Sequence, residues 1–532
     1  MEENINSDNK SLNKEKIENI DMTTRYIIEN IQNIIIMFCN PLSGNKEGKI
    51  ILDISANYRT LEDYKLIDFQ YLNSKKNYEP IKAVFFELID KEDNAKGQLL
   101  LKHCAERCKI NKEKGLSEEY YKIRTLIGGG DGTVLSMIES FIKNGTDINY
   151  CTFGHVPLGT GNDLANTLGF SDHIDISANN LNQLYYVLNK YYKANFGKID
   201  IWKMDLQLDD IEGEILVNTK EGKIQLKDDN GNVLKRYVRS FINYVSLGYD
   251  ARVGYNFDPK RTNSRNGNKC IYFCEGFKKL TCRKTVSIQG FIDTFTIYDS
   301  LDNSINQESF FSERTNDANI NMNNKVKFQF ISKSTYKKEK KANNNNMGKR
   351  LVIEGEPCSI IFQNIINYMS GVNDMWGKGK EQLAISVKDT DKEVSKKYTK
   401  KLKEMADMKQ AFDDKKLEVF AFDNGFKTGF EKVIGGFAKK IYHGRGPMEV
   451  KFLDTPKFLE EDKKNRIYLN LDGEYFHIVK PIIMRLELNK DIWGLGIGDW
   501  GLGIGDWAQS PIPILKNNKN NINKNNKFKF IY

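Results

Sequence analysis

The chain has 532 residues, of which 40% are hydrophobic, 11% aromatic and 28% charged; this is a globular composition whose length suits about three or four domains, or two with insertions. Its net charge of +9 is too small to indicate a nucleic-acid-binding protein, but it agrees with weak attraction to anionic membranes or nucleotides. The sequence has no apolar run near the roughly 20 residues of a membrane-spanning helix, and its polar N-terminus lacks the apolar core of a secretory signal.

The first third of the chain alternates strand and helix patterns. Residues before about 28 are rich in Asn, Lys and Glu, which predicts disorder. Short apolar, β-branched runs then predict strands at 34–39, 82–88, 121–127 and 149–154, and helix-like spacing predicts helices at 134–142 and from 163 to 168. Strands followed by glycine turns and helices indicate an α/β domain with a parallel sheet.

Strands dominate after about residue 196. They are predicted at 200–206, 241–247, 417–422, 448–452 and 483–488, with few helices between them. This texture indicates a second, mostly antiparallel β domain. Low-complexity segments near 301–350 and 381–416 predict surface insertions.

The strongest local signal is the run Gly128-Gly129-Gly130-Asp131-Gly132-Thr133, which follows a predicted strand and opens a helix. Glycines let the backbone approach an anion, and a helix N-terminus offers N–H donors, so the run favours phosphate binding over a plain tight turn. It is not a Walker A loop, because no G-x4-G-K-S/T pattern occurs. It is not a dinucleotide-binding fingerprint either, because Thr133 stands where the third glycine belongs. Asp131 is predicted to bind Mg²⁺ or to accept a proton.

Two further loops follow predicted strands. Residues 40–45 (NPLSGN) could hold a phosphate through the Ser43 hydroxyl, although a simple loop explains them equally well. Residues 157–165 (PLGTGNDLA) place a hydroxyl between two glycines, and Asn162 or Asp163 could instead be a helix N-cap. Three such loops at the carboxyl ends of parallel strands would meet at one crevice, which strengthens the phosphate hypothesis.

A carboxylate pair lies in the second half, at Asp472-Gly473-Glu474. An Asp-Gly pair is typical of a hairpin turn. The alternative is that Asp472 acts as a general base, or assists one, by taking a hydroxyl proton during phosphoryl transfer.

Together, GGGDGTV at 128–134, PLGTGNDLA at 157–165 and NPLSG at 40–44 resemble the catalytic domain of diacylglycerol kinases, in a superfamily that also holds sphingosine and ceramide kinases. Further segments resemble the accessory domain of the eukaryotic members: 199–202, 243–251, 263–269, 367–377 (with Val372 where a glycine is usual), 417–419 and 472–474. The resemblance covers about residues 30–170 and 197–490. It implies a catalytic, ATP-binding domain at 31–196 and an accessory domain at 197–490, with a disordered segment at 1–30 and a Trp/Gly repeat plus Lys/Asn-rich tail at 491–532.

The resemblance implies ATP- and Mg²⁺-dependent phosphorylation of 1,2-diacylglycerol to phosphatidic acid, in a cleft between the two domains. It implies catalytic roles for Asp131, Asp472 and Glu474, with Asp131 also binding the metal. The implied partners are diacylglycerol in membranes and an anionic membrane surface, with no nucleic acid, so we expect a cytoplasmic, peripherally membrane-associated enzyme. The implied nucleotide-binding residues are Asn40, Ser43, Gly44, Gly129, Gly130, Gly132, Thr133, Gly159, Thr160, Gly161, Asn162 and Asp163.

Three alternatives remain at this point. A kinase for sphingosine or ceramide fits the phosphate loops, but the eukaryotic-type accessory segments argue against it. A soluble NAD kinase shares a G-G-D-G-T loop, but not the PLGTGND segment. An inactive lipid-binding scaffold is disfavoured because Asp131, Asp163 and Asp472 are all present.

Eukaryotic family members usually carry cysteine-rich zinc modules ahead of the catalytic domain, and we expect none here. The pairs Cys104/Cys108 and Cys270/Cys274 have C-x3-C spacing, but zinc ligation would require two further Cys or His close to each pair. Near the C-terminus, GLGIGDW occurs at 494–500 and again at 501–507. Its tryptophans, followed by a lysine-rich tail, could sit at a membrane interface, although a duplicated loop is the simpler interpretation.

Overall fold

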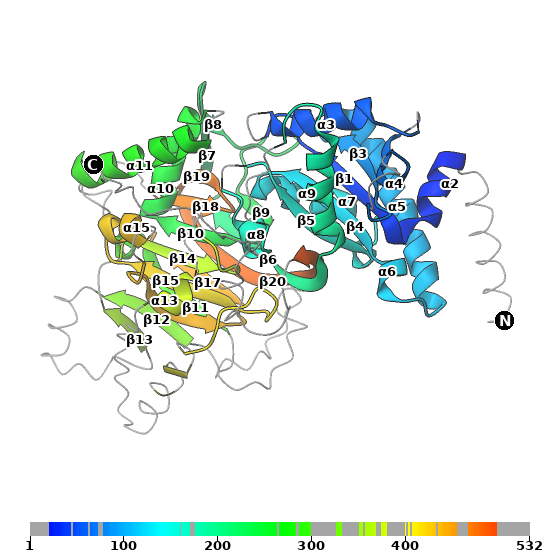
Figure 1. Cartoon of the computed structure of the whole chain (residues 1–532). Coiled ribbons are helices and arrows are strands. Elements are labelled where there is room, and N and C mark those ends of the chain that lie inside the picture. The colour runs from blue at the N-terminus through cyan, green and yellow to red at the C-terminus, as the bar shows by residue number, and fades with distance from the viewer. Residues whose placement is uncertain are drawn as a thin grey trace, which may run out of the picture.

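Two units stand side by side in the computed structural model of the chain (Figure 1). The structure describes residues 21–43, 46–61, 64–72, 78–159, 161–170, 176–262, 265–282, 287–298, 326–331, 350–354, 357–368, 374–379, 400, 403–404, 407–431, 435–454 and 467–496. Among the helices within these ranges, none is long and apolar enough to cross a membrane.

The first unit is a parallel sheet covered by helices. Its strands are β1 (Ile34–Cys39), β2 (Lys65–Asp68), β3 (Lys82–Glu87), β4 (Ile123–Gly129) and β5 (Cys151–Pro157). The order is β5-β4-β1-β3-β2, and every pairing is parallel except that of the edge strand β2. Helices in this unit are α2 (Met22–Glu29), α3 (Glu47–Asn57), α4 (Phe69–Leu72), α5 (Lys91–Glu113), α6 (Glu118–Tyr121), α7 (Asp131–Lys143), α8 (Asp163–Thr167) and α9 (Leu181–Tyr192). Strands β1, β4 and β5 are buried throughout, as expected for a sheet covered on both faces.

The second unit is mostly antiparallel. An eight-stranded sheet has the order β16-β15-β14-β10-β18-β19-β7-β8, and all of its pairings are antiparallel. Its strands are β7 (Glu214–Thr219), β8 (Gly222–Gln225), β10 (Tyr244–Gly248), β14 (Ser359–Gln363), β15 (Leu417–Phe422), β16 (Lys439–Gly444), β18 (Ile467–Leu471) and β19 (Glu474–Val479). Helices α10 (Tyr249–Phe257), α11 (Arg265–Cys282), α13 (Met375–Lys378) and α15 (Gly425–Glu431) accompany it. The predicted fold class is therefore confirmed, and α10 and α11 are helices of the second unit for which the sequence patterns indicated no bounds.

One sheet runs through both units. Strand β20 (Pro481–Gly496) pairs with β6 (Asn195–Leu208) and β17 (Met448–Phe452), and its end pairs in parallel with β5. The twelve-stranded sheet that results also includes β9 (Arg236–Phe241), β11 (Ile292–Ile297), β12 (Val326–Ile331) and β13 (Arg350–Glu354). The boundary expected near residue 196 is thus crossed by paired strands.

The end of β20 lies within the segment expected to be a repeat and tail. Leu495 is fully buried, and the half-buried ring of Trp493 lies 3.7 Å from Lys122 Nζ and 4.3 Å from Lys198 Nζ, measured to the ring centroid. Trp493 is therefore part of the folded sheet, whereas residues 497–532 lie outside the described residues. Of the segment 1–30 that was expected to be disordered, residues 1–20 also lie outside the described residues, whereas Met22–Glu29 form helix α2. Similarly, Gln410 and Phe412 are buried, although they lie in the segment expected to be a surface insertion.

Candidate active site

The three predicted phosphate loops meet at one edge of the parallel sheet. Strands β1, β4 and β5 end in register there, with Cys39 beside Gly128 and Gly129 beside Pro157. The Asn40 amide continues this pattern by donating to Gly128 O at 2.9 Å. The expected convergence of the loops is therefore present in the structure.

The loop at 128–133 and the loop at 157–165 touch through their backbones. A Cβ atom placed on Gly159 would lie 2.6 Å from the Cα of Gly130, closer than real Cβ atoms approach other heavy atoms. A Cβ on Gly129 would lie 2.7 Å from Thr133 Cβ. Glycine is therefore required at Gly159 for the two loops to touch, and at Gly129 for the second loop to turn closely around Thr133.

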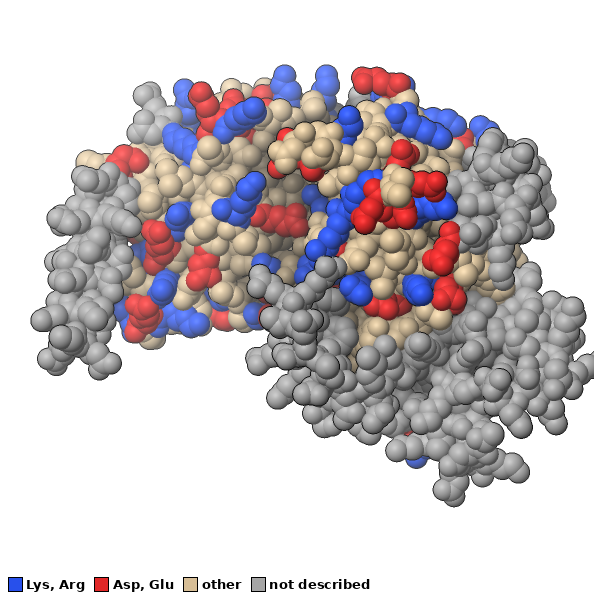
Figure 2. Space-filling view, turned by 180° about the vertical axis from the view of Figure 1, so that it is seen from behind, with Lys and Arg blue, Asp and Glu red and all other residues tan. Residues whose placement is uncertain are grey.

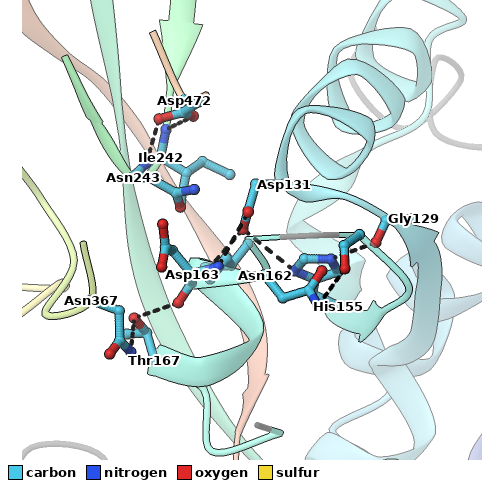
Figure 3. Close-up of polar contacts among 12 residues, drawn as sticks. Gly129, Asp131, His155, Asn162, Asp163, Thr167, Ile242, Asn243, Asn367 and Asp472 are labelled. Atoms are coloured by element: carbon cyan, nitrogen blue, oxygen red, sulfur yellow. Dashed lines mark hydrogen bonds and ion pairs between the residues drawn. The ribbon is translucent and has the colours of Figure 1, made fainter. Parts of the chain in front are cut away.

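Asp131 joins these two loops. It begins α7, and its carboxylate accepts hydrogen bonds from Leu164 N at 2.9 Å and Asp163 N at 3.2 Å (Figure 3). Asp131 therefore caps the N-terminus of α8 with a negative charge, where the helix dipole stabilises it. Each carboxylate oxygen accepts one of these two bonds and retains a lone pair for another ligand.

His155 is a member of this cluster that the sequence patterns did not identify. It is fully buried near the end of β5, its Nε2 lies 3.1 Å from Gly129 O, and its Nδ1 lies 3.8 Å from Asp131 Oδ1. Because a carbonyl can only accept, Nε2 carries the proton and Nδ1 presents a lone pair towards Asp131. Burial lowers the pKa of His155 and favours this neutral form. The available signal was a histidine in an otherwise apolar strand.

The start of α8 carries the polar end of the third loop. Asn162 has a left-handed backbone (φ 56°), and its side-chain amide donates to Gly159 O at 3.0 Å, which closes the loop. Asp163 is buried, and Tyr244 of the second unit donates to its Oδ2 at 3.4 Å. Asn367 also donates to Thr167 Oγ1 at 3.0 Å, so two side chains of the second unit hold α8.

Asp472 approaches from the second unit. Its Oδ1 accepts from the amides of Asn243 and Tyr244, both at 2.9 Å, and its Oδ2 accepts from Ile242 N at 2.8 Å. These bonds interrupt the run predicted as one strand at 241–247, so that β9 ends at Phe241 and β10 begins at Tyr244. Burial raises the pKa of Asp472 to about 7, despite the three amides that lower it, and the charge of Asp131 contributes to the rise.

Glu474 faces the first unit across the gap. It is exposed at the start of β19, and its Oε1 lies 3.5 Å from the position that a Cβ on Gly132 would occupy. Figure 2 shows, from behind, a recess between the two units with acidic and basic side chains at its edges. The predicted carboxylates of the second unit therefore stand opposite the glycine loop of the first.

The remaining predicted residues lie around the same edge. Asn40 closes its own turn, with its Oδ1 accepting from Leu42 N at 3.0 Å, and Ser43 N donates to Asn40 O at 3.2 Å. Gly132, Thr133 and Gly161 are partly exposed on the two loops. Gly44 and Thr160 lie outside the described residues.

The donor set suits a nucleotide with its Mg²⁺ better than a metal held by protein alone. Within the described ranges, no group of three or more His, Cys, Asp or Glu side chains is placed to hold a metal ion. Mg²⁺ usually binds through one or two carboxylates together with phosphate oxygens and water. Asp131 offers such a carboxylate beside a cradle from which Cβ atoms are excluded at Gly129 and Gly159. The residues present therefore fit this pair of ligands.

Comparison with known proteins gives two family matches. The diacylglycerol kinase catalytic domain matches residues 35–187, and the diacylglycerol kinase accessory domain matches residues 240–475. Among curated proteins, diacylglycerol kinase 3 of Arabidopsis thaliana is 25% identical over 260 residues, which are 45% of this chain and 47% of the relative. Diacylglycerol kinase 7 of the same plant is 26% identical over 244 residues, 43% of this chain and 44% of the relative. The matched region is thus about half the length of these relatives.

The chain also aligns structurally with a solved structure of a candidate diacylglycerol kinase from Bacillus anthracis. The alignment covers 88% of this chain and 97% of that one, at 11% identity and a TM-score of 0.36. This similarity is too low to bear on function.

Proposed function

Because the chain belongs to the diacylglycerol kinase family, we propose that it transfers the γ-phosphate of ATP to the free hydroxyl of 1,2-diacylglycerol, giving phosphatidic acid and ADP. The observation that carries the proposal is the arrangement of two glycine loops opposite Asp472 and Glu474. Phosphoryl transfer needs positioned donors, a metal and one proton acceptor, with little covalent chemistry by the protein.

The glycine loops bind and orient the phosphates. The amides of Asp163 and Leu164 already donate to Asp131, so the N-terminus of α7, with the backbone of Gly129, Gly130 and Gly132, is left to face the triphosphate. Mg²⁺ supplies charge neutralisation at the phosphates, and Asp131 would hold it. The amides of Asp163 and Leu164 at the start of α8 fix the orientation of Asp131.

The second unit supplies the proton acceptor. Two of the four lone pairs of Asp472 lie on Oδ1 and are taken by Asn243 and Tyr244, and a third is taken by Ile242, which leaves one on Oδ2. A pKa of about 7 suits a general base at neutral pH. We assign this role to Asp472, with Glu474 placed at the entrance facing Gly132.

Diacylglycerol resides in membranes, so the enzyme must work at a membrane surface. We therefore propose a peripheral association with anionic membranes, with diacylglycerol and ATP as the two substrates.

The test is a substrate panel in mixed micelles, with labelled ATP and Mg²⁺ offered with diacylglycerol, sphingosine or ceramide in parallel. We expect label only in phosphatidic acid. Label in a sphingolipid would keep the mechanism and replace the substrate. Folded protein that binds ATP but labels none of the three lipids would contradict the proposal.

A further inference from the structure

Helix α11 presents apolar and basic residues together on the surface of the second unit. The helix packs across α10 at the outside of this unit (Figure 1). Its inner side carries Tyr272, which is partly buried, and Asn268 and Glu275, which are buried. Its outer side carries Cys270, Phe273, Cys274 and Phe277, which we call the α11 face.

The α11 face is unusually apolar for an exposed surface. The side chains of Phe273 and Phe277 are 69% and 54% exposed, and both cysteines are exposed. The spacing of these four residues places them on one side of a helix, so they form a continuous strip. Contiguous exposed aromatic surface marks an interaction site.

The charge of the surrounding sequence identifies the partner. Residues 260–284 contain eight Lys or Arg (260, 261, 265, 269, 278, 279, 283 and 284) and one acid, Glu275, so this segment carries +7 of a net +9 for the whole chain. The side chains of Lys260, Arg261 and Lys278 are 48%, 47% and 64% exposed. Lys260 and Lys278 both pair with Glu275, and Arg261 pairs with Asp258, so these cations add to the basic surface while also holding acidic side chains. A helix with aromatic residues on one side, in a segment of the sequence rich in Lys and Arg, suits the interface of an anionic bilayer.

The helix is connected to the candidate active site. Tyr272 OH lies 3.5 Å from Asp250 O, and Tyr368 OH donates to the Asp250 carboxylate at 2.8 Å. The ring of Tyr368 lies 4.8 Å from that of Tyr244, whose hydroxyl donates to Asp163. A membrane bound at α11 would therefore lie beside a continuous path of side chains leading to the reacting groups.

We propose that the α11 face is the surface by which this protein binds an anionic membrane, with Phe273 and Phe277 entering the headgroup region and the flanking cations contacting acidic lipids. The choice of a bilayer as partner rests on the proposed function, because the substrate of a diacylglycerol kinase lies in one.

The test compares Phe273→Ser/Phe277→Ser with Leu99→Ser, a control at a side chain of the first unit that is 56% exposed. Serine and phenylalanine have similar helix propensity, so α11 should persist. Co-sedimentation with vesicles of phosphatidylcholine, with and without phosphatidylserine, measures membrane binding without ATP. Phosphorylation of a water-soluble short-chain diacylglycerol measures the active site alone.

We expect the wild type and the Leu99 variant to bind phosphatidylserine vesicles equally, and the double variant to bind at least about tenfold more weakly. Binding should fall at about 0.5 M salt and on neutral vesicles. The double variant should phosphorylate the soluble substrate at the wild-type rate. Equal vesicle binding by the double variant and the wild type, or no binding by the wild type, would overturn the inference and leave a protein partner as the occupant. If vesicle binding is lost as expected but even the wild type fails to phosphorylate the soluble substrate, the membrane surface stands and the proposed function falls.

Discussion

The two phosphate loops touch at Gly130 and Gly159, and this contact is possible because Gly159 has no Cβ atom. A side chain at Gly159 would push one loop away from the other, since its Cβ would lie 2.6 Å from the backbone Cα of Gly130. Asp131 bridges the same two loops through the amides of Asp163 and Leu164, so a shift would also change its orientation.

Gly159→Ala should therefore reduce activity by about 100-fold, because displacing a substrate-binding loop by about 1 Å can lower the rate by that factor. Steady-state kinetics and ATP binding would measure it. The control is Gly429→Ala in α15, where a Cβ meets no atom within 4 Å; it should leave activity unchanged and raise stability by about 0.5–1 kcal/mol. Wild-type activity of Gly159→Ala would show that the loops do not need their present contact.

Asp472 should give activity a characteristic pH dependence. Only the ionised carboxylate can accept a proton, and its pKa is raised to about 7. Activity, measured as kcat/KM, should thus rise with pH through about 7 and level off above it. Asp472→Asn should remove most activity and Glu474→Gln much less. A profile that is flat between about pH 6 and pH 8.5 would exclude Asp472 as the base.

The residues of the site were predictable where the information is local. A glycine run after a strand predicts a phosphate-binding loop, and parallel strands bring such loops together. These two rules predicted that Gly129, Asp131 and Gly159 belong to one site. The partners of Asp472 were not predictable, because Ile242 is 230 positions away in the chain. His155 was also missed, since nothing in the strand pattern around it indicates a contact with Asp131.

Among the elements, the junction of β9, β10 and β14 depends on one buried side chain. Asn364 directly follows β14, and its amide donates to Asp200 O at 2.9 Å and Ile242 O at 2.7 Å. Its oxygen accepts from Trp202 Nε1 at 3.1 Å. Asn364 therefore holds the turn whose amides bind Asp472.

Asn364→Ala should lower the free energy of unfolding by about 3 kcal/mol, because it leaves buried donors and acceptors without partners. Asn489→Ala, at an exposed residue with one 3.3 Å bond to Ser240, should change it by less than about 0.5 kcal/mol. Denaturant unfolding would compare the two. A similar small effect for both variants would mean that Asn364 is replaceable, for instance by water.

Element prediction from the sequence succeeded for buried apolar runs and failed where distant contacts decide. The run at 34–39 became β1 with identical limits, because a short run of six apolar residues, three of them β-branched, is typical of a strand buried on both faces. The run at 241–247 was split by amides that turn towards Asp472. The strand ending at Gly496 was assigned to a tail from residue 491, because alternating glycines conceal the burial of Leu495.

At the scale of the whole molecule, β20 makes the two units one structure. It pairs with β17 and β6 along most of its length and with β5 at its end. Because the sheet that contains β20 runs through both units, unfolding of either unit would expose core residues of the other.

We therefore expect one unfolding transition for the described fold, with hydrogen exchange in β1 and β15 reporting the same free energy of global opening. Trp493→Ala, which removes the contacts with Lys122 and Lys198, should lower both values together by about 1–2 kcal/mol. Two separate transitions, with only the first unit affected by the substitution, would show that the units fold independently.

We propose that the cleft between the units transfers phosphate to diacylglycerol with the help of Asp131. The most direct measurement is formation of phosphatidic acid and ADP from a soluble diacylglycerol and ATP with Mg²⁺, for the wild type, Asp131→Asn and the exposed control Asp229→Asn. We predict equal amounts of both products from the wild type and the control, and a loss of about 100-fold or more in Asp131→Asn. Wild-type activity in Asp131→Asn, or ADP formation without phosphatidic acid in any of them, would contradict the account.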